Sequence, residues 1–232
     1  MPLYFPLHEF GNRPVVKVVK QWARTAKAET VKYVKRKIAA AANDDASDIR
    51  QPFLEPEGHR YLRECLRDAQ SFLEYGAGGS TLLAVTAGVP EIVTVESDGE
   101  FLAMIENEVR ATAYAGQWRG LHADVGPTKK WGYPVNKPSA EMGLAYALRP
   151  FPMSADVVLI DGRFRAACCV ATAVHAGVGT RILFDDYAGR EYYRGVEEHL
   201  GKPEMVGGMA VFVVGERRPT SDQIARFAAD AR

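Results

Sequence analysis

A turn with two glycines follows an apolar run in the segment FLEYGAGGSTLLAV, residues 72–85. Gly76 and Gly78 allow the backbone to turn tightly and to approach a ligand closely, because they carry no side chain. Ser80 or Thr81 can cap the helix that we expect next. The exposed N–H groups at the start of such a helix favour an anionic group. The segment therefore predicts a strand, a ligand-binding turn and a helix.

A second apolar run, in VTVESD, ends at the carboxylate Glu96, twenty residues after Gly76. In nucleotide-binding α/β proteins, an acid at this distance hydrogen-bonds the hydroxyls of a ribose. However, Thr81 stands where a dinucleotide fingerprint has its third glycine, and the acid Glu74 precedes the turn. Both features weaken a nicotinamide interpretation, so an NAD-dependent oxidoreductase is kept only as an alternative.

The motif EYGAGG resembles the first motif of the class I S-adenosylmethionine-dependent methyltransferases, which has the form acid-x-Gly-x-Gly. The resemblance covers about residues 55 to 215. It implies that the glycine turn passes under the methionyl part of S-adenosylmethionine, that the acid after the second strand holds the ribose, and that a polar residue after the third strand contacts the adenine. By position, the implied cofactor-binding residues are Glu74, Gly76, Gly78, Glu96 and Asp124. To these we add Ser80, at the start of the expected helix, and Ser97, which can line the adenosine, although loop polarity explains Ser97 equally well.

Aspartates also follow two later apolar runs, VVLIDGRFR at 157–165 and ILFDDY at 182–187. Asp161, Asp185 and Asp186 can supply the oxygen ligands that Mg²⁺ prefers, and such an ion would polarise an acceptor hydroxyl. This arrangement is similar to that of metal-dependent small-molecule O-methyltransferases. The alternative carries equal weight: Asp161 binds the methionyl amine, Asp185 caps a helix and Asp186 is solvated.

We predict Asp161 and Tyr187 as the catalytic residues. Tyr187 follows the aspartate pair and can deprotonate or wall an acceptor, although tyrosines at such positions more often pack. Arg163 and Arg165 can clamp an acidic substrate through bidentate hydrogen bonds, but we expect both to be solvated at the surface. The insertion GPTKKWGYPVNKPS, residues 126–139, is rich in proline and glycine, and we hypothesise that it is a lid that selects the acceptor.

The residues above must be positioned by short apolar runs that alternate with helical stretches, which is typical of a parallel sheet covered on both faces. We expect strands at 71–75, 92–96, 120–122, 157–161, 181–184 and 210–214, and helices at 58–69, 80–87, 100–115, 166–176 and 190–200. A hairpin turning at Gly207 and Gly208 adds an antiparallel strand pair. The predicted fold is a doubly wound, mostly parallel seven-stranded α/β sheet, with its strand ends meeting at one ligand-binding edge.

The amino-terminal region differs in charge from the rest of the chain. Residues 1–40 hold nine lysines and arginines but two glutamates, whereas the whole chain has 29 cationic and 29 anionic side chains. Apolar residues recur there at helical spacing, so we expect a basic amphipathic helix, followed by a polar linker at 43–52. A membrane surface or RNA is one possible target, but packing on the body or on a second subunit is favoured. We divide the chain into this helical extension with its linker, residues 1–50, and a Rossmann-like methyltransferase domain that binds S-adenosylmethionine, residues 51–232.

Composition limits the remaining function classes. A hydrophobic fraction of 47% and a charged fraction of 25% are ordinary for a globular protein. No apolar run reaches the length of a membrane span and the start lacks a secretory signal pattern, so we expect a cytoplasmic protein. Three cysteines offer neither zinc-ligand spacing nor a disulfide framework. The sequence thus predicts methyl transfer from S-adenosylmethionine, most simply to an oxygen of a small molecule. The alternative is a non-catalytic adenosyl-binding or RNA-associated module. Nucleic acid is not the expected partner.

Overall fold

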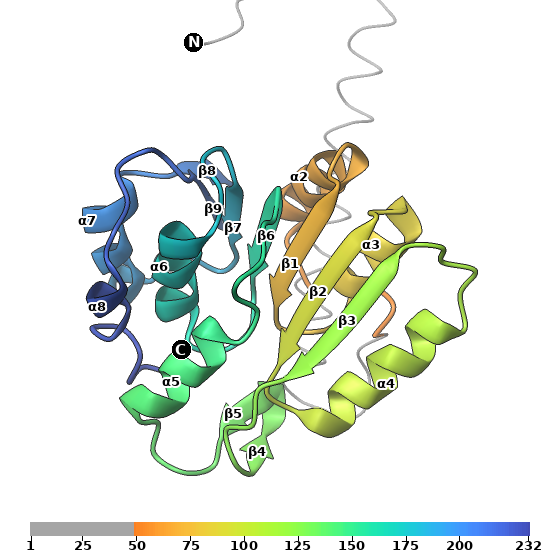
Figure 1. Ribbon diagram of the computed structural model, residues 1–232, viewed down its shortest axis with the longest axis horizontal. Coiled ribbons are helices and arrows are strands. Elements are labelled where there is room, and N and C mark those ends of the chain that lie inside the picture. Colours follow the sequence, from red (N-terminus) through yellow and green to blue (C-terminus); the bar gives the residue numbers. More distant parts are fainter. Residues whose placement is uncertain (1–48) are drawn as a thin grey trace, which may run out of the picture. The chain divides into compact units, whose positions relative to one another are not determined.

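The computed structural model describes residues 49–232, which contain two sheets (Figure 1). The main sheet consists of β1 (Ser71–Tyr75), β2 (Glu91–Glu96), β3 (Gln117–His122), β6 (Val157–Ile160), β7 (Arg181–Phe184), β8 (Glu204–Val206) and β9 (Met209–Val213). Its order is β3-β2-β1-β6-β7-β9-β8. The first five strands of this order are parallel, and β9 is antiparallel to both β7 and β8. The doubly wound sheet with its carboxyl-terminal hairpin is therefore confirmed.

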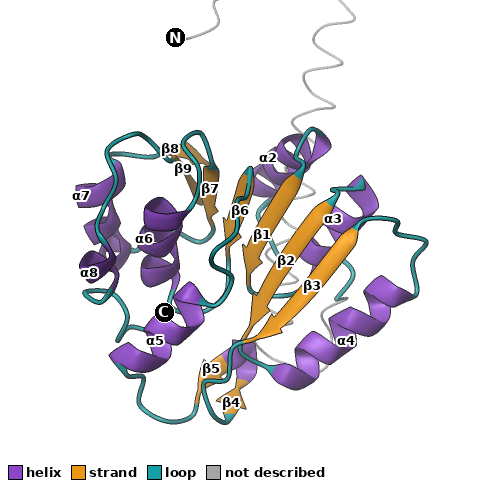
Figure 2. Ribbon diagram, in the orientation of Figure 1, coloured by secondary structure: helices purple, strands orange, loops and turns teal. Residues whose placement is uncertain are grey.

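Helices cover both faces of this sheet (Figure 2). They are α2 (Pro56–Arg67), α3 (Gly79–Ala87), α4 (Gly99–Arg110), α5 (Ala140–Leu148), α6 (Arg165–His175), α7 (Glu197–Leu200) and α8 (Ser221–Ile224), with 3-10 turns η1 (Lys130–Gly132) and η2 (Glu191–Val196). Buried residues of α2, α3 and α4 form one core cluster with the sheet, and those of α5, α6, η2 and α8 form another. The sheet is thus the middle layer of three.

Alternation along the strands explains the two cores. Phe72 joins the cluster under α2 to α4, while its neighbours in β1, Leu73 and Tyr75, join the cluster under α5 and α6. Successive side chains of a strand point to opposite faces, so a strand buried on both faces must be apolar at nearly every position. Glu74 breaks this rule: it is fully buried and on the same face as Phe72.

Several helices and strands begin or end at other residues than predicted. The expected helix at 100–115 ends at Arg110, the third strand begins three residues early, at Gln117, and the expected helix at 190–200 divides into η2 and α7. Helix α5 was not predicted; Gly143 in its interior is unfavourable for a helix. In the structure Gly143 lies directly against the backbone of Ala228, where a side chain has no room. The insertion is also more ordered than expected, since β4 (Thr128–Lys129), η1 and β5 (Tyr133–Pro134) form a small antiparallel hairpin there.

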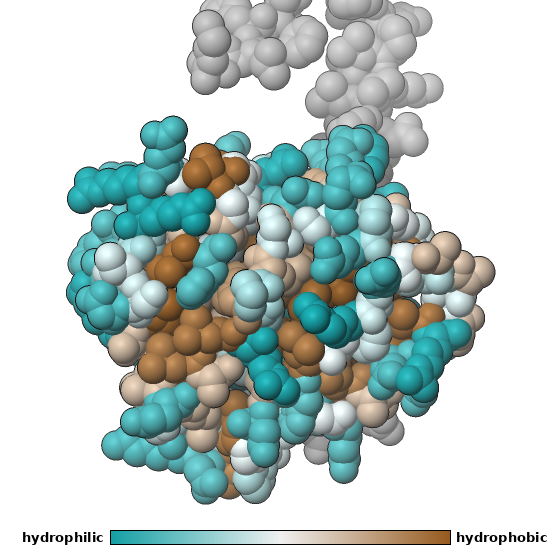
Figure 3. Space-filling model, viewed as in Figure 1, coloured by the Kyte–Doolittle hydropathy of each residue, from teal (hydrophilic) through white to brown (hydrophobic). Residues whose placement is uncertain are grey.

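The basic helix expected within residues 1–40, and its suggested role in oligomerisation, lie outside the described residues. None of the helices in 49–232 has the length and apolarity needed to cross a bilayer. Cys65, Cys168 and Cys169 are buried, and none of them forms a disulfide within the described residues. Figure 3 shows the face seen in Figure 1, with apolar side chains gathered in its middle and polar side chains around its rim.

Candidate functional site

The glycine turn lies where the chain reverses its order of strand addition. Strands β2 and β3 are added on one side of β1, and β6 lies on the other side. Gly76, which follows β1, has a φ of 100° and donates its N–H to the carbonyl of Val95 at 2.8 Å. A Cβ on Gly76 would lie 2.7 Å from the backbone nitrogen of Gly162, which follows β6. Ligands of open α/β sheets bind at such a switch point, beyond the carboxyl ends of the strands.

The next two glycines have opposite surroundings. A Cβ on Gly78 would meet no atom of residues 49–232 within 4 Å, whereas one on Gly79 would collide with the backbone of Gln51 and Pro52. The segment before α2 therefore crosses the start of α3, and open space remains beside Gly78. This space is a feature that a ligand under the glycine turn requires.

Glu74 braces the turn from beneath. Its carboxylate accepts hydrogen bonds from Ser80 Oγ at 2.6 Å, from Thr81 Oγ1, and from Thr94 Oγ1 at 2.8 Å. Burial raises the pKa of Glu74 from 4.5 to about 7, although the three hydroxyl groups favour the ionised form. Because Glu74 is fully buried, its place in the structure is that of a support, and so is that of the Ser80 hydroxyl bonded to it.

Glu96 ties the end of β2 to the glycine turn. Its Oε2 accepts the N–H of Ala77 at 2.9 Å, and its Oε1 accepts the backbone N–H groups of Ser97 and Asp98 at 2.7 and 2.9 Å. Burial raises the pKa of Glu96, and these backbone donors oppose the shift. The acid expected to hold a ribose is thus fixed beside the turn, with one hydrogen bond on Oε2 within the described part of the chain.

The insertion lies over this acid. Ser97 Oγ donates to the carbonyl of Gly132 at 3.0 Å, and Thr128 Oγ1 donates to Asp98 at 3.2 Å. The neighbouring Trp131 contacts Phe53, with ring centroids 5.7 Å apart. Residues 128–134 and the segment before α2 therefore meet above the carboxyl end of the sheet, where a lid was predicted.

Asp124, expected near the adenine, is exposed in the loop after β3. Its Oδ1 accepts the N–H of Gly126 at 2.8 Å, which stabilises a tight turn. Nearby, His122 Nε2 lies 3.2 Å from the carbonyl oxygen of Ser97. The structure thus brings Asp124 to the same edge as Glu96, in a loop open to solvent.

The three aspartates beyond β6 and β7 surround an arginine that was expected at the surface. Arg165 is buried and forms an ion pair with Asp161 at 2.9 Å and a longer one with Asp186 at 3.8 Å. It also donates to the carbonyl oxygens of Asp161, Gly162 and Asp185. Burial, Asp161 and Asp186 raise the pKa of Asp185, against the influence of Arg165. The prediction that Arg165 is solvated is therefore wrong.

This arrangement does not support the predicted magnesium site. The guanidinium of Arg165 supplies the positive charge that Mg²⁺ would bring to Asp161, and Arg190 forms a second ion pair with Asp186 at 2.7 Å. Within residues 49–232, no group of three or more histidine, cysteine, aspartate or glutamate side chains is arranged to hold a metal ion. The carboxylates Asp161, Asp185 and Asp186 are instead parts of a charge network.

Tyr187 belongs to an aromatic cluster. It is buried, its hydroxyl donates to Glu197 at 2.8 Å, and its ring contacts those of Phe184, Tyr193 and Phe212. Burial and the bond to Glu197 raise the pKa of the Tyr187 hydroxyl. A phenol held in this way is a packing residue, which is the alternative weighed for it above.

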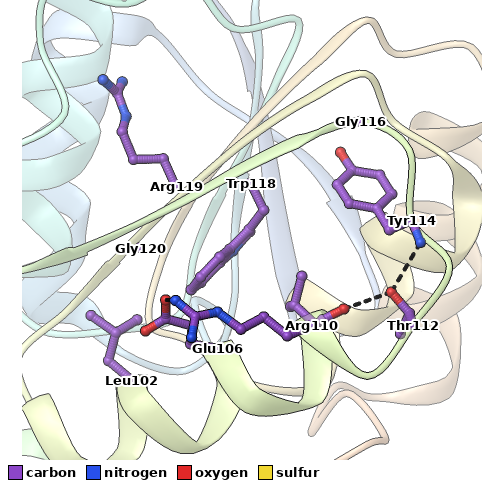
Figure 4. A pocket seen from close by; sticks show the side chains of 10 residues that line it. Leu102, Glu106, Arg110, Thr112, Tyr114, Gly116, Trp118, Arg119 and Gly120 are labelled. Atoms are coloured by element: carbon purple, nitrogen blue, oxygen red, sulfur yellow. Dashed lines mark hydrogen bonds and ion pairs between the residues drawn. The ribbon is translucent and has the colours of Figure 1, made fainter.

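A cavity of about 530 Å³ lies elsewhere, between α4 and the edge strand β3 (Figure 4). Trp118 points into it from β3, and Glu106 and Arg110 line it from α4. None of the site residues predicted from the sequence lines this cavity. The glycine turn and its surroundings therefore remain the candidate site.

Comparisons with known proteins give the family. No protein-family model and no curated protein matches the chain. A solved structure of a methyltransferase-like protein from Silicibacter pomeroyi is 33% identical, with a TM-score of 0.71 over 78% of this chain and 99% of that chain.

More distant neighbours have lower similarity. An RNA methyltransferase from Salinibacter ruber, solved with S-adenosyl-L-homocysteine, is 14% identical, with a TM-score of 0.43 over 73% of this chain and 97% of that one. An O-methyltransferase from Bacillus cereus, also solved with S-adenosylhomocysteine, is 15% identical, with a TM-score of 0.46 over 81% and 90%. The methyltransferase-like protein from Silicibacter pomeroyi is identical to this chain at a third of the aligned residues and is aligned over nearly its whole length. The chain therefore belongs to the class I S-adenosylmethionine-dependent methyltransferases.

Proposed function

We propose that this methyltransferase binds S-adenosylmethionine at the glycine turn and methylates an oxygen atom of a small acceptor. The observation that carries the proposal is the link between Glu96 and Ala77 at 2.9 Å, which fixes the ribose-binding acid beside a turn whose next glycine faces open space. When bound, the cofactor supplies an electrophilic methyl group on a sulfonium.

The surroundings fit that cofactor. Gly76 and Gly78 present backbone without side chains, and Glu96 Oε2 can accept a ribose hydroxyl in addition to the N–H of Ala77. Glu74 acts indirectly, by holding Ser80 and Thr81 at the start of α3. Asp124 and Ser97 complete the edge on the side of β3, where the adenine is expected.

Asp161 is our candidate for the residue that handles the acceptor. It follows β6, its side chain is 28% exposed, and Arg165 holds its Oδ1 at 2.9 Å. We propose that Asp161 accepts a hydrogen bond from the acceptor hydroxyl and takes its proton while the oxygen gains the methyl group. Positioning of the two reactants and removal of one proton are then the main contributions of the protein.

Two segments that lie against the start of α3 and against Ser97 support a small acceptor. The segment before α2 lies against Gly79, and the insertion lies against Ser97, with Phe53 and Trp131 in contact. We expect such a cover to admit a small molecule more easily than a polymer. The insertion also supplies the aromatic rings of Trp131 and Tyr133, which suit an apolar acceptor body.

The proposal is tested by methyl transfer from labelled S-adenosylmethionine to two panels, small phenols and sugars on one hand and total RNA on the other. Asp161→Asn should lose about tenfold or more in kcat with S-adenosylhomocysteine affinity unchanged, and the exposed Asp68→Asn should change neither. Transfer to RNA alone would contradict the small-molecule acceptor. Equal turnover by Asp161→Asn would contradict the role of Asp161.

A further inference from the structure

Arg163 occupies an unusual position at the edge described above. It lies two residues after Asp161, at the carboxyl end of β6, and only 7% of it is exposed. Its backbone is fixed at both ends, because its N–H donates to the Tyr146 hydroxyl at 3.4 Å and its carbonyl accepts from Cys168 Sγ at 3.4 Å. The prediction of a solvated Arg163 is therefore wrong.

The guanidinium of Arg163 is stacked on an aromatic ring, and it forms no hydrogen bond with the described part of the chain. Its central carbon lies 4.0 Å from the centroid of the Tyr133 ring, which comes from the insertion. Its Nε is buried and has no hydrogen-bond partner among the residues that the structure describes. Within residues 49–232, no acidic side chain forms an ion pair with it. Arg165, two residues later, is also buried, but its guanidinium has carboxylate and carbonyl partners.

A guanidinium buried without acceptors is costly. Burial removes the hydration of Nε, and its N–H then needs an acceptor from elsewhere. Stacking on Tyr133 offsets part of this cost and fixes the plane of the guanidinium. The in-plane edge carrying Nε is the part of the group that still lacks an acceptor. An arrangement of this kind indicates a ligand with two coplanar oxygens, because a carboxylate accepts two parallel N–H bonds from such an edge.

We propose that Arg163, stacked on Tyr133, binds a carboxylate of one of the two reactants. The inference rests on the methyltransferase function proposed above, and it adds a binding residue to that site. Two reactants can bring the carboxylate: the amino-acid end of the methyl donor, or an acidic acceptor. In either case, Arg163 determines specificity and Tyr133 orients it.

Nuclear magnetic resonance can observe the proposed contact directly. In protein labelled with ¹⁵N-arginine, the Nε–H signal of Arg163 is assigned by its loss in Arg163→Gln. Arg119→Gln, which removes an exposed arginine of β3, is the matched control. The signal is then followed during addition of S-adenosylhomocysteine, and separately during addition of saturating sodium acetate to that complex, against sodium chloride at equal ionic strength. A carboxylate on Nε should move the signal downfield.

Calorimetry separates the two sources of the carboxylate. If the donor brings it, Arg163→Gln should weaken S-adenosylhomocysteine binding about ten- to hundredfold, leave methylthioadenosine binding unchanged, and be partly rescued by Arg163→Lys. Methylthioadenosine is the informative probe because it lacks the amino-acid end. Tyr133→Phe should retain the affinity and Tyr133→Leu should not.

If the acceptor brings the carboxylate, S-adenosylhomocysteine should bind Arg163→Gln normally and acetate should move the Nε–H signal. A signal that neither S-adenosylhomocysteine nor acetate moves would overturn the inference. Failure of the wild-type protein to bind S-adenosylhomocysteine would instead contradict the proposed function, and acetate would still decide the role of Arg163.

Discussion

Gly76 and Gly162 lie against each other at the switch point of the sheet. A Cβ on either residue would lie 2.7 Å from the backbone nitrogen of the other. Gly76 comes from the end of β1 and Gly162 from the end of β6, so the contact joins the two strands whose carboxyl ends form the floor of the site. The close approach of these two backbones explains why neither position has space for a side chain.

Gly162→Ala is expected to destabilise the protein by about 3 kcal/mol, because the added methyl would meet both Gly76 and the Tyr146 hydroxyl in a packed core. The free energy of unfolding is measured by urea denaturation. Gly78→Ala is the matched control and should change stability by less than about 0.5 kcal/mol, since its Cβ enters open space. Equal stabilities for the two variants would contradict the described contact.

Gly78→Val is expected to fold normally and to lose cofactor binding. The backbone at Gly78 has a φ of 162°, an extended conformation that valine adopts readily. The larger side chain would fill the space beside the turn. Thermal melting with and without S-adenosylhomocysteine checks this: the wild-type protein should gain stability and the variant should not. A variant stabilised as much as the wild type would show that the ligand lies elsewhere.

Glu74→Gln is expected to alter the pH dependence of stability. The pKa of Glu74 is about 7 in the folded state against an ordinary 4.5, so the folded state binds the proton more tightly. Glu74 therefore favours folding at low pH, and this contribution falls as pH rises from 4.5 to about 7, by up to about 3 kcal/mol.

Glutamine cannot ionise, so the variant should lack this decline. The comparison is the difference in unfolding free energy between wild type and variant at pH 5 and pH 8. Parallel pH profiles would contradict the pKa shift. Thr86→Val serves as control, because it removes a hydroxyl from α3, the helix that also holds Ser80 and Thr81, without touching Glu74.

Arg165→Met is expected to cost about 3 to 5 kcal/mol at pH 8, because it leaves the carboxylates of Asp161, Asp185 and Asp186 without their buried cation. The loss should be smaller at pH 5, where burial and mutual repulsion allow Asp185 to take up a proton. The more exposed Arg190→Met should cost about 1 kcal/mol or less. Similar losses for the two variants would contradict a central role for Arg165.

Much of the fold could be predicted from the sequence, because periodicity and turn residues act locally. The strand at Ser71–Tyr75, the glycine turn and the hairpin at Gly207 all lie where they were predicted. Helix α5 was missed. Its Gly143 is locally unfavourable for a helix, and the reason for a glycine there is the contact with Ala228, which is distant in the sequence. Local patterns do not contain such long-range packing.

The site was predictable as a location and less so as a set of contacts. The sequence indicated Glu74, Glu96 and Asp161 at one edge, and the structure brings them there. It did not indicate that Glu74 would be buried under three hydroxyls, that Arg165 would neutralise the aspartates, or that Arg163 would stack on Tyr133. Charged residues after a strand are equally compatible with solvent and with burial, and only three-dimensional contacts distinguish the two.

Isothermal titration of the full-length protein with S-adenosylhomocysteine tests the central claim most directly, with NADH titrated in parallel. The account predicts saturable binding of one S-adenosylhomocysteine per chain, lost in Gly78→Val, and no heat of binding from NADH. Binding of NADH, or no binding of S-adenosylhomocysteine by a folded protein, would contradict the assignment of the glycine turn as the cofactor site.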